Sequence, residues 1–346
     1  MTHKKETNCS ALVRSPAFLP DTAYIPYGKG KTRFLVLAFS CLALLTGSVA
    51  GGEPQQANSL RCNAAEKSPS CRTLRTMARV YMAYGEYTKA QPLAERALTL
   101  AKRNGEDDSE LAMCLIDLAT LYKNQNKLLD AEKMCKLGLE LQKKALYENH
   151  PYVAYTFRTL GAIYQEQGKY GQAGSALDEA MTIMLDSHTE NDKALVPFWV
   201  DIAGLLVEKR DFKEAESYYQ RAMTLINSSY GPDHLYTANV LGSVARLYTL
   251  QGRYDEAEEL IDRTVATQEK IYGPDNHLIA GSWLTKARVC LAKGNYVSSE
   301  KLIEKALSSV RKTGNTAIFT KLEQRVEEIR ASSQTTSGPV AKAIDS

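Results

Sequence analysis

Large apolar residues recur along most of the chain at helical spacing. Tyr248 illustrates the pattern, because Leu241, Val244 and Ala245 precede it by seven, four and three residues. Those offsets place all four side chains on one face of an α-helix. The same arrangement, broken only by Lys286 in the last unit, surrounds six positions that follow one another at intervals of 41 or 42 residues. We name them the anchors: Tyr81, Tyr122, Tyr164, Leu206, Tyr248 and Cys290. The chain therefore repeats one helical unit six times.

A small residue stands three positions before every anchor: Ala78, Ala119, Gly161, Ala203, Ala245 and Ala287. A larger side chain at this point would hold two packed helices apart, so the pattern predicts a second helix that crosses closely there. Four residues after the anchors, a turn is predicted because most of the residues are Gly or Asn, which tolerate a left-handed backbone: Gly85, Asn126, Gly168, Arg210, Gly252 and Gly294. Each unit is thus predicted to be a helical hairpin.

This signature resembles that of the tetratricopeptide repeat family over about residues 71–312. The period of 42 and the linker Tyr230-Gly231-Pro232-Asp233-His234, echoed at Tyr272-Gly273-Pro274-Asp275, resemble the kinesin-light-chain subtype of that family. The resemblance implies an all-α fold, a right-handed superhelical solenoid of six helix-turn-helix units. It also implies a non-catalytic protein whose concave face binds a peptide or a partner protein.

The segments around the repeats have other compositions. Ile318, Leu322, Val326 and Ile329 share one helical face, which predicts a C-terminal capping helix over residues 315–331 that covers the last hairpin. Residues 51–69 are predicted to be a polar linker and residues 332–346 a disordered tail. No stretch remains for a second globular domain.

Residues 1–50 have the pattern of a secretory signal peptide. Lys29, Lys31 and Arg33 precede an apolar run that begins at Phe34, and small residues follow up to Ala50. Cleavage after Ala50 would export the protein to the periplasm or the extracellular space. The alternative is an uncleaved segment that anchors the protein to the membrane through residues 34–50.

Cysteine usage is compatible with export. Cys62 and Cys71 lie close together near the start of the mature chain and are a candidate disulfide. Cys114, Cys135 and Cys290 fall on helix faces, where buried free thiols are the usual outcome. No pair has the spacing of a zinc or redox motif.

Charge and histidine spacing argue against nucleic-acid binding and catalysis. The net charge is +3, but residues 1–50 hold six basic and two acidic residues, which leaves 37 basic and 38 acidic residues in the body. A nucleic-acid-binding domain needs a basic surface. His150, His234 and His277 occupy equivalent linkers, which indicates a packing or capping role. We therefore predict no enzyme activity, cofactor or metal site.

The candidate site is the inner face of the first helices of the repeats. Five residues before the anchors, the side chain is always short and polar, which suits hydrogen bonds to a peptide backbone and equally suits a solvated surface. Arg72, Arg75 and Arg79 share one stripe of the first helix, and Arg246 and Arg288 lie in neighbouring units. The predicted partner-binding residues are Arg72, Arg75, Thr76, Arg79, Asp117, Thr159, Asp201, Ser243, Arg246, Thr285 and Arg288.

Two functions fit these patterns. The first is an exported scaffold that binds a peptide segment or a partner domain in the groove. The second is a membrane-anchored assembly or regulatory subunit of an envelope enzyme complex. Family members that bind C-terminal carboxylates use Lys, Asn and Arg at inner positions, and neither Lys nor Asn occurs five or two residues before the anchors here. Binding of a chaperone tail is therefore not expected.

Overall fold

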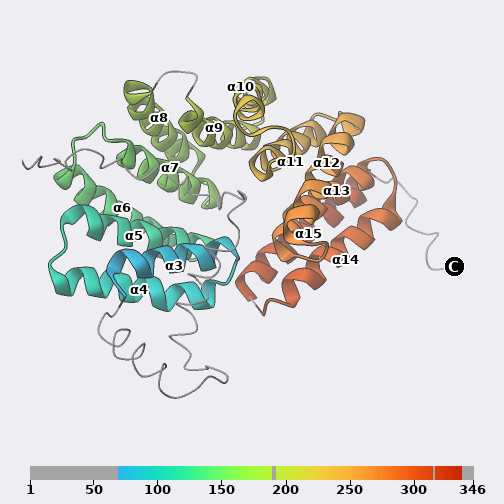
Figure 1. The fold of residues 1–346 in the computed structure, drawn as a ribbon. Helices are drawn as coiled ribbons and strands as arrows, with labels where there is room; N and C mark the ends of the chain where they lie inside the picture. The colour runs from blue at the N-terminus through green and yellow to red at the C-terminus, as the bar shows by residue number, and fades with distance from the viewer. Residues whose placement is uncertain (1–68, 189–191, 315, 337–346) are drawn as a thin grey trace, which may run out of the picture. The chain divides into compact units, whose positions relative to one another are not determined.

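The computed structural model describes residues 69–188, 192–314 and 316–336. Within these ranges the chain forms thirteen α-helices, α3 to α15, two short 3-10 helices and no strand (Figure 1). The all-α prediction is confirmed. The predicted leader with its cleavage point at Ala50, the linker as far as residue 68, Cys62 and residues 337–346 lie outside the described residues.

Twelve of the helices form six consecutive hairpins, as the repeat predicted. Their bounds are α3 (Cys71–Ala83) with α4 (Tyr87–Asn104), α5 (Asp108–Asn124) with α6 (Leu128–Ala145), α7 (Pro151–Glu166) with α8 (Tyr170–Ser187), α9 (Val196–Glu208) with α10 (Phe212–Tyr230), α11 (Leu235–Leu250) with α12 (Tyr254–Tyr272), and α13 (Ala280–Ala292) with α14 (Tyr296–Arg311). The 3-10 helices η1 (Lys193–Leu195) and η2 (His277–Ile279) precede α9 and α13.

The turn within each hairpin depends on one left-handed residue. All six predicted positions have a positive φ, from 61° at Asn126 to 79° at Gly252. Arg210 adopts a φ of 63° although it has a full side chain. This backbone region costs an L-residue with a Cβ roughly 1–2 kcal/mol, so Arg210 is a strained position in an otherwise regular turn.

The close crossing of the two helices of a hairpin is also confirmed. Ala78, Ala119, Ala203, Ala245 and Ala287 are fully buried. At Gly161, the remaining position of this set, a Cβ would lie 3.0 Å from Cγ of Leu177 on α8. The backbones are therefore close enough that a larger residue would have to displace the neighbouring helix.

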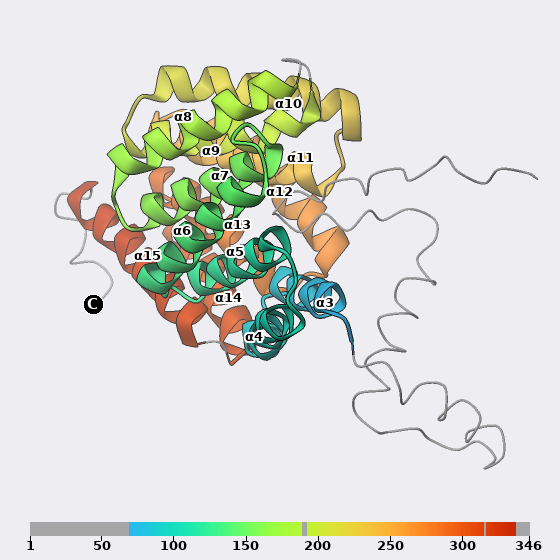
Figure 2. The same cartoon turned by 90° about the vertical axis from the view of Figure 1, so that its left-hand side faces the viewer.

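The hairpins stack in chain order, so that each first helix contacts the first helix of the next hairpin (Figure 2). We name the row formed by α3, α5, α7, α9, α11 and α13 the inner row. The array is curved enough to bring its last helix next to its third hairpin. Lys321 of the last helix forms an ion pair of 2.7 Å with Glu166 of α7. The side of the inner row that faces this ion pair is the inner face.

The last helix, α15 (Thr316–Thr336), caps the array. Its residues Leu322, Val326 and Ile329 are buried against α13 and α14, as the sequence predicted. The helix continues to Thr336, five residues beyond the predicted boundary at 331. The sequence has no helix-breaking residue before Gly338-Pro339, so nothing local ends the helix earlier.

Candidate partner-binding face

Four of the predicted inner residues are hydroxyl side chains that bond to their own helix. Thr76, Thr159, Ser243 and Thr285 each donate to the carbonyl oxygen four residues earlier, over 2.9, 3.0, 3.2 and 3.1 Å. This i to i−4 bond is a common way to satisfy Ser and Thr within a helix. The hydroxyl hydrogens of these four side chains are therefore already engaged. Their oxygens can only accept hydrogen bonds from a partner.

The two aspartates of the set join consecutive repeats. Oδ2 of Asp117 accepts from Nε of Arg75 at 2.8 Å, and Oδ2 of Asp201 accepts from Nε of Arg158 at 2.5 Å. Both arginines precede the partner aspartate by about one period and are only 8% exposed. Sequence reasoning missed Arg158, although it occupies the position in its unit that Arg75 occupies in the first.

The three arginines of α3 do not form one exposed stripe. Arg72 is exposed, whereas Arg75 is buried and also donates to Glu110 at 2.8 Å. The side chain of Arg79 is 37% exposed, and its Nε lies 4.0 Å from Oδ1 of Asp117. The carboxylates of α5 thus compensate the positive charge at this end of the inner face.

A polar pocket of about 180 Å³ brings together three of the predicted residues, Asp201, Ser243 and Arg246. Gln165 of α7 and Tyr219 of α10 complete its polar lining. Burial raises the pKa of Tyr219 to about 12, so its phenol remains protonated near neutral pH. The pocket is large enough for one side chain of a partner and offers both donors and acceptors.

Next to this pocket, three arginines from three helices lie near enough for their charges to act on one another: Arg246 of α11, Arg288 of α13 and Arg325 of α15. We name them the arginine cluster. Arg246 pairs with Glu208, and Arg288 lies 3.5 Å from Glu328. Arg325 has no carboxylate within ion-pair distance among the described residues.

The arginine cluster is electrostatically unfavourable as it stands. Burial, followed by the charges of Arg288 and Arg246, lowers the pKa of Arg325. Burial and the charge of Arg246 likewise lower the pKa of Arg288. A lowered pKa means that the protein holds the positive charge less well than water does. Two carboxylates do not neutralise three guanidinium groups, so the cluster is an attractive place for an added anion.

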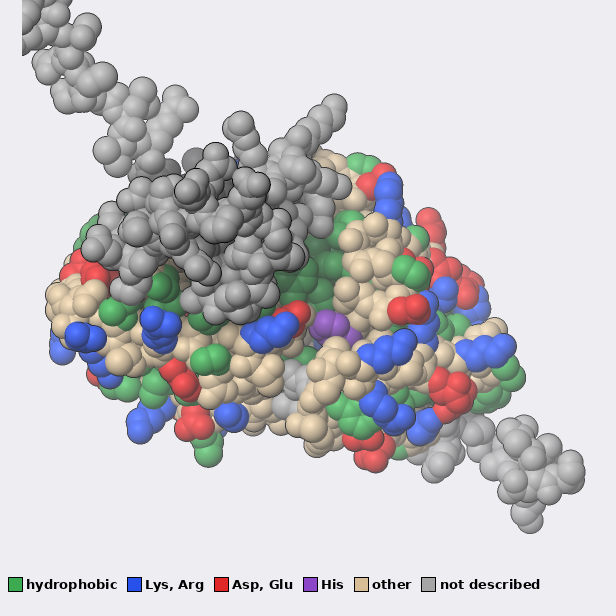
Figure 3. Space-filling view, turned by 60° about the horizontal axis from the view of Figure 1, so that its bottom comes forward, with side chains coloured by type: hydrophobic (Ala, Val, Ile, Leu, Met, Phe, Trp, Pro, Cys, Tyr) green, Lys and Arg blue, Asp and Glu red, His purple; other side chains and the backbone are tan. Residues whose placement is uncertain are grey.

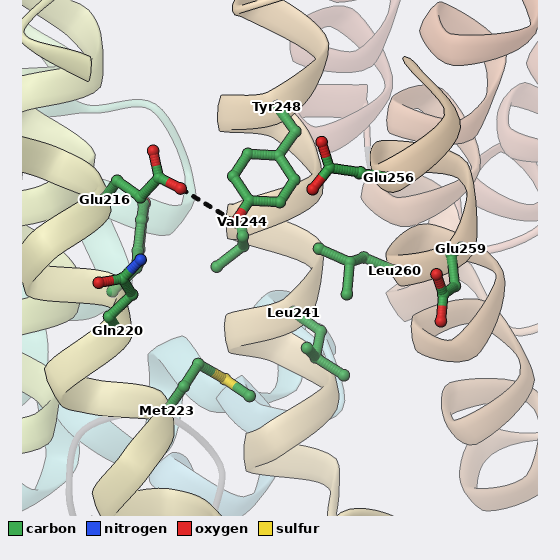
Figure 4. Close-up of a pocket in the computed structure, with 10 residues that line it drawn as sticks. Glu216, Gln220, Met223, Leu241, Val244, Tyr248, Glu256, Glu259 and Leu260 are labelled. Atoms are coloured by element: carbon green, nitrogen blue, oxygen red, sulfur yellow. Dashed lines mark hydrogen bonds between the residues drawn. The ribbon is translucent and has the colours of Figure 1, made fainter. Parts of the chain in front are cut away.

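A larger pocket of about 330 Å³ lies between α10, α11 and α12 (Figure 4). Two of its three carboxylates, Glu216 and Glu256, are already paired within the protein. Glu216 accepts from the hydroxyl of Tyr248 at 3.2 Å, and Arg253 donates to both Glu216 and Glu256. We assign this pocket no ligand, because two of its carboxylates already serve bonds within the protein.

Two of the linker histidines are helix caps, in agreement with the sequence. Nδ1 of His150 accepts from the backbone N–H of Tyr152, and Nδ1 of His234 accepts from that of Tyr236, both at 3.1 Å. At the third linker Asn276 takes this role, and His277 instead lies against Gly85 of the first turn. No set of three or more His, Cys, Asp and Glu side chains in the described ranges could hold a metal ion.

Charges of both signs are mixed on one face of the molecule (Figure 3). On the face shown in Figure 3, basic and acidic side chains are interspersed and do not gather by sign. Among the helices that the structure describes, none is long and apolar enough to cross a bilayer.

Stacked helical hairpins with a small residue at each crossing define a helical repeat solenoid. The sequence profile of the tetratricopeptide repeat family matches residues 70–144, 197–270 and 243–312, which together exceed half of the chain. The chain belongs to this family. Arrays of this kind present an extended surface to other proteins, so family membership supports a protein-interaction scaffold.

Several solved structures share the fold. BtubC (BKLC) from P. vanneervenii is 19% identical, with 66% of this chain and 91% of that chain covered and a TM-score of 0.50. The apo form of RapI is 16% identical over 73% and 88% of the two chains, with a TM-score of 0.53. A Rap protein complexed with Competence and Sporulation Factor is 13% identical over 81% and 80%, with a TM-score of 0.56. No curated protein matches the chain significantly in sequence.

Proposed function

We propose that the protein is an exported, non-catalytic scaffold that holds an extended segment or a domain of a partner protein against its inner face. The arginine cluster supports this proposal most strongly. The charges of three guanidinium groups act on one another there beside two carboxylates, and no carboxylate lies within ion-pair distance of Arg325 among the described residues. A carboxylate from a partner would relieve the repulsion between these groups and form charge-assisted hydrogen bonds.

The polar pocket gives a second contact for the same partner. Arg246 lines the pocket and belongs to the cluster, so the two sites are continuous. An acidic residue over the cluster and a neighbouring polar side chain in the pocket would fix the register of an extended segment. The complex of a Rap protein with Competence and Sporulation Factor is a case in which a protein of similar fold is bound to a partner.

Affinity capture from the native source tests this proposal. The bait is the wild-type protein, compared with Arg246→Ala/Arg288→Ala/Arg325→Ala. The matched control removes three exposed basic residues from second helices, with Arg96→Ala/Lys213→Ala/Lys301→Ala. We expect the cluster variant to lose at least one partner that the control retains. Equal capture by all three baits would refute the role of the inner face.

Whether residues 1–50 are cleaved distinguishes an exported scaffold from the membrane-anchored alternative. A mature N-terminus near Gly51, measured by intact mass, supports a released scaffold. Retention of residues 34–50 in a membrane fraction would instead support the anchored assembly or regulatory subunit of an envelope enzyme complex.

A further inference from the structure

Two buried cysteines meet across the boundary between the first and second repeats. The Sγ atoms of Cys71 on α3 and Cys114 on α5 lie 3.4 Å apart. Cys71 is 4% exposed and Cys114 is 1% exposed. A rotation of the side chains that brings the two sulfurs about 1.4 Å closer would reach the length of a disulfide bond.

The residues around these two thiols favour a bond between Cys71 and Cys114 over a bond to another cysteine. Sγ of Cys71 also lies 3.4 Å from the carbonyl oxygen of Ala97, and with Leu74 and Ala101 these residues form one small apolar cluster. Cys135 is buried elsewhere and points to the carbonyl oxygen of Thr156 at 3.6 Å. Among the described residues, Cys71 and Cys114 are the cysteines that the fold brings into contact.

We propose that Cys71 and Cys114 form a disulfide in an oxidising compartment and thereby tie the first hairpin to the second. The oxidant is a disulfide, either glutathione disulfide or the active-site disulfide of a thiol oxidoreductase. The thiolate of one cysteine attacks the oxidant and releases its first thiol. The thiolate of the other then attacks this mixed disulfide and releases the second thiol. Two S–H bonds are lost, one S–S bond forms, two protons leave and two electrons reduce the oxidant.

The bond should form while the chain folds. Burial raises the pKa of both thiols in the folded protein, so the reactive thiolate is scarce there. A mixed disulfide with an external thiol would also need space that two buried side chains lack. The same burial protects the finished bond, because a reductant can reach it only after the first hairpin opens.

The position of the pair at the first described repeat gives the bond a structural purpose. Apart from the contact of His277 with Gly85, the first described hairpin packs on the second hairpin. Few large side chains hold α3, whose buried residues are Cys71, Leu74, Arg75 and Ala78. At the other end of the array α15 supplies an apolar cap. A covalent link from α3 to α5 would oppose fraying of the first hairpin.

This pairing competes with the one that the sequence suggested between Cys62 and Cys71. Cys62 lies outside the described residues, and that pairing stays a prediction. The thiol of Cys71 can join only one partner, so one experiment distinguishes the two.

The full-length wild-type protein is unfolded, fully reduced, and refolded in a mixture of reduced and oxidised glutathione. Free thiols are then blocked with iodoacetamide, and a non-reducing digest is analysed by mass spectrometry. We expect most of Cys71 in a peptide cross-linked to the peptide that contains Cys114. The same linkage should persist in Cys62→Ser and in the control Cys135→Ser. Recovery of Cys71 mainly as the alkylated thiol, or linked to any other cysteine, would overturn the proposal.

A second measurement uses the same sequence in two redox states, so no side chain is replaced. Amide hydrogen exchange is compared between the linked protein and the same protein refolded and kept in a thiol reductant, without alkylation. We expect slower exchange in α3 and α4 of the linked form, and a melting temperature higher by about 5 °C. Equal protection of α3 and α4 in both forms would contradict the proposed stapling role.

Discussion

Nε of Arg75 on α3 donates to Oδ2 of Asp117 on α5 at 2.8 Å, and the two residues stand one repeat period apart. Arg158 and Asp201 reproduce the relationship two repeats later. Each pair lies on the inner face and joins the first helices of neighbouring hairpins. The repeat sequence therefore encodes polar contacts between units as well as the apolar packing within them.

Replacement of Arg75 should destabilise the first repeats. Arg75→Ala would remove the cation that pairs with both Asp117 and Glu110, and loss of one member of a buried pair costs roughly 3–5 kcal/mol. The matched control is Arg72→Ala, an exposed arginine one turn away, which should change the free energy of unfolding by less than about 0.5 kcal/mol. Chemical denaturation measures both. Equal effects of the two substitutions would show that the buried pairs contribute little.

The fold could be predicted because the same local rules recur in every unit. Ala78 and its five equivalents are small at one helical position, and the turn residues that follow the anchors tolerate a left-handed backbone. Such signals need no knowledge of distant contacts. The end of α15 at Thr336 was missed because sequence reasoning stopped the helix with its apolar face, whereas the backbone continues until a breaking residue.

Arg210 offers a test of the turn geometry. Arg210→Gly should stabilise the protein by about 1 kcal/mol, because Gly adopts a φ of 63° without the steric cost that a Cβ brings. The converse control is Gly168→Ala in the preceding unit, where the backbone φ is 73°. A Cβ at this position has no neighbouring atom within 4 Å, so only the backbone conformation opposes the substitution. That substitution should destabilise by a similar amount. Changes of the same sign in both variants would contradict this explanation.

Ala245 tests the close crossing of helices. It is fully buried in the apolar cluster that contains Ile261 and Val265 of α12. Ala245→Leu adds three carbons where no space exists and should cost roughly 1–3 kcal/mol. Thermal unfolding followed by circular dichroism measures the effect. An unchanged melting temperature would mean that this position is not a close crossing.

The inner face was less predictable than the fold. The pattern identified Asp117 and Arg246 as inner residues, yet could not show that Asp117 is already bound to Arg75. Whether a charged side chain is available to a binding partner depends on whether a residue of another repeat already pairs with it. The local periodicity of the sequence does not show such pairs between repeats. Arg325 was missed for a related reason. Its helix was recognised by its apolar face alone, and the approach of α15 to α13 follows from the packing of the whole array.

The histidine caps predict a pH dependence of stability. Nδ1 of His150 and of His234 can accept the N–H of the capped helix only when it carries no proton. Burial lowers the pKa of both rings below the ordinary 6.5. The unfolded chain therefore binds protons at these positions more readily than the folded protein does. The stabilisation is complete above about pH 7 and declines as the pH falls through 6.5 toward the folded pKa values.

Asparagine can cap these two helices without titrating, so His150→Asn/His234→Asn isolates the effect. Asn is a favoured N-cap residue, and the double variant should match the wild-type protein in stability at pH 8 within about 1 kcal/mol. Between pH 7 and pH 5 the melting temperature of the wild-type protein should fall more steeply than that of the variant, because only the histidines become charged at a helix N-terminus, where a cation is unfavourable. Scanning calorimetry at several pH values measures both curves. Parallel curves would show that protonation of these rings does not control the stability of the array.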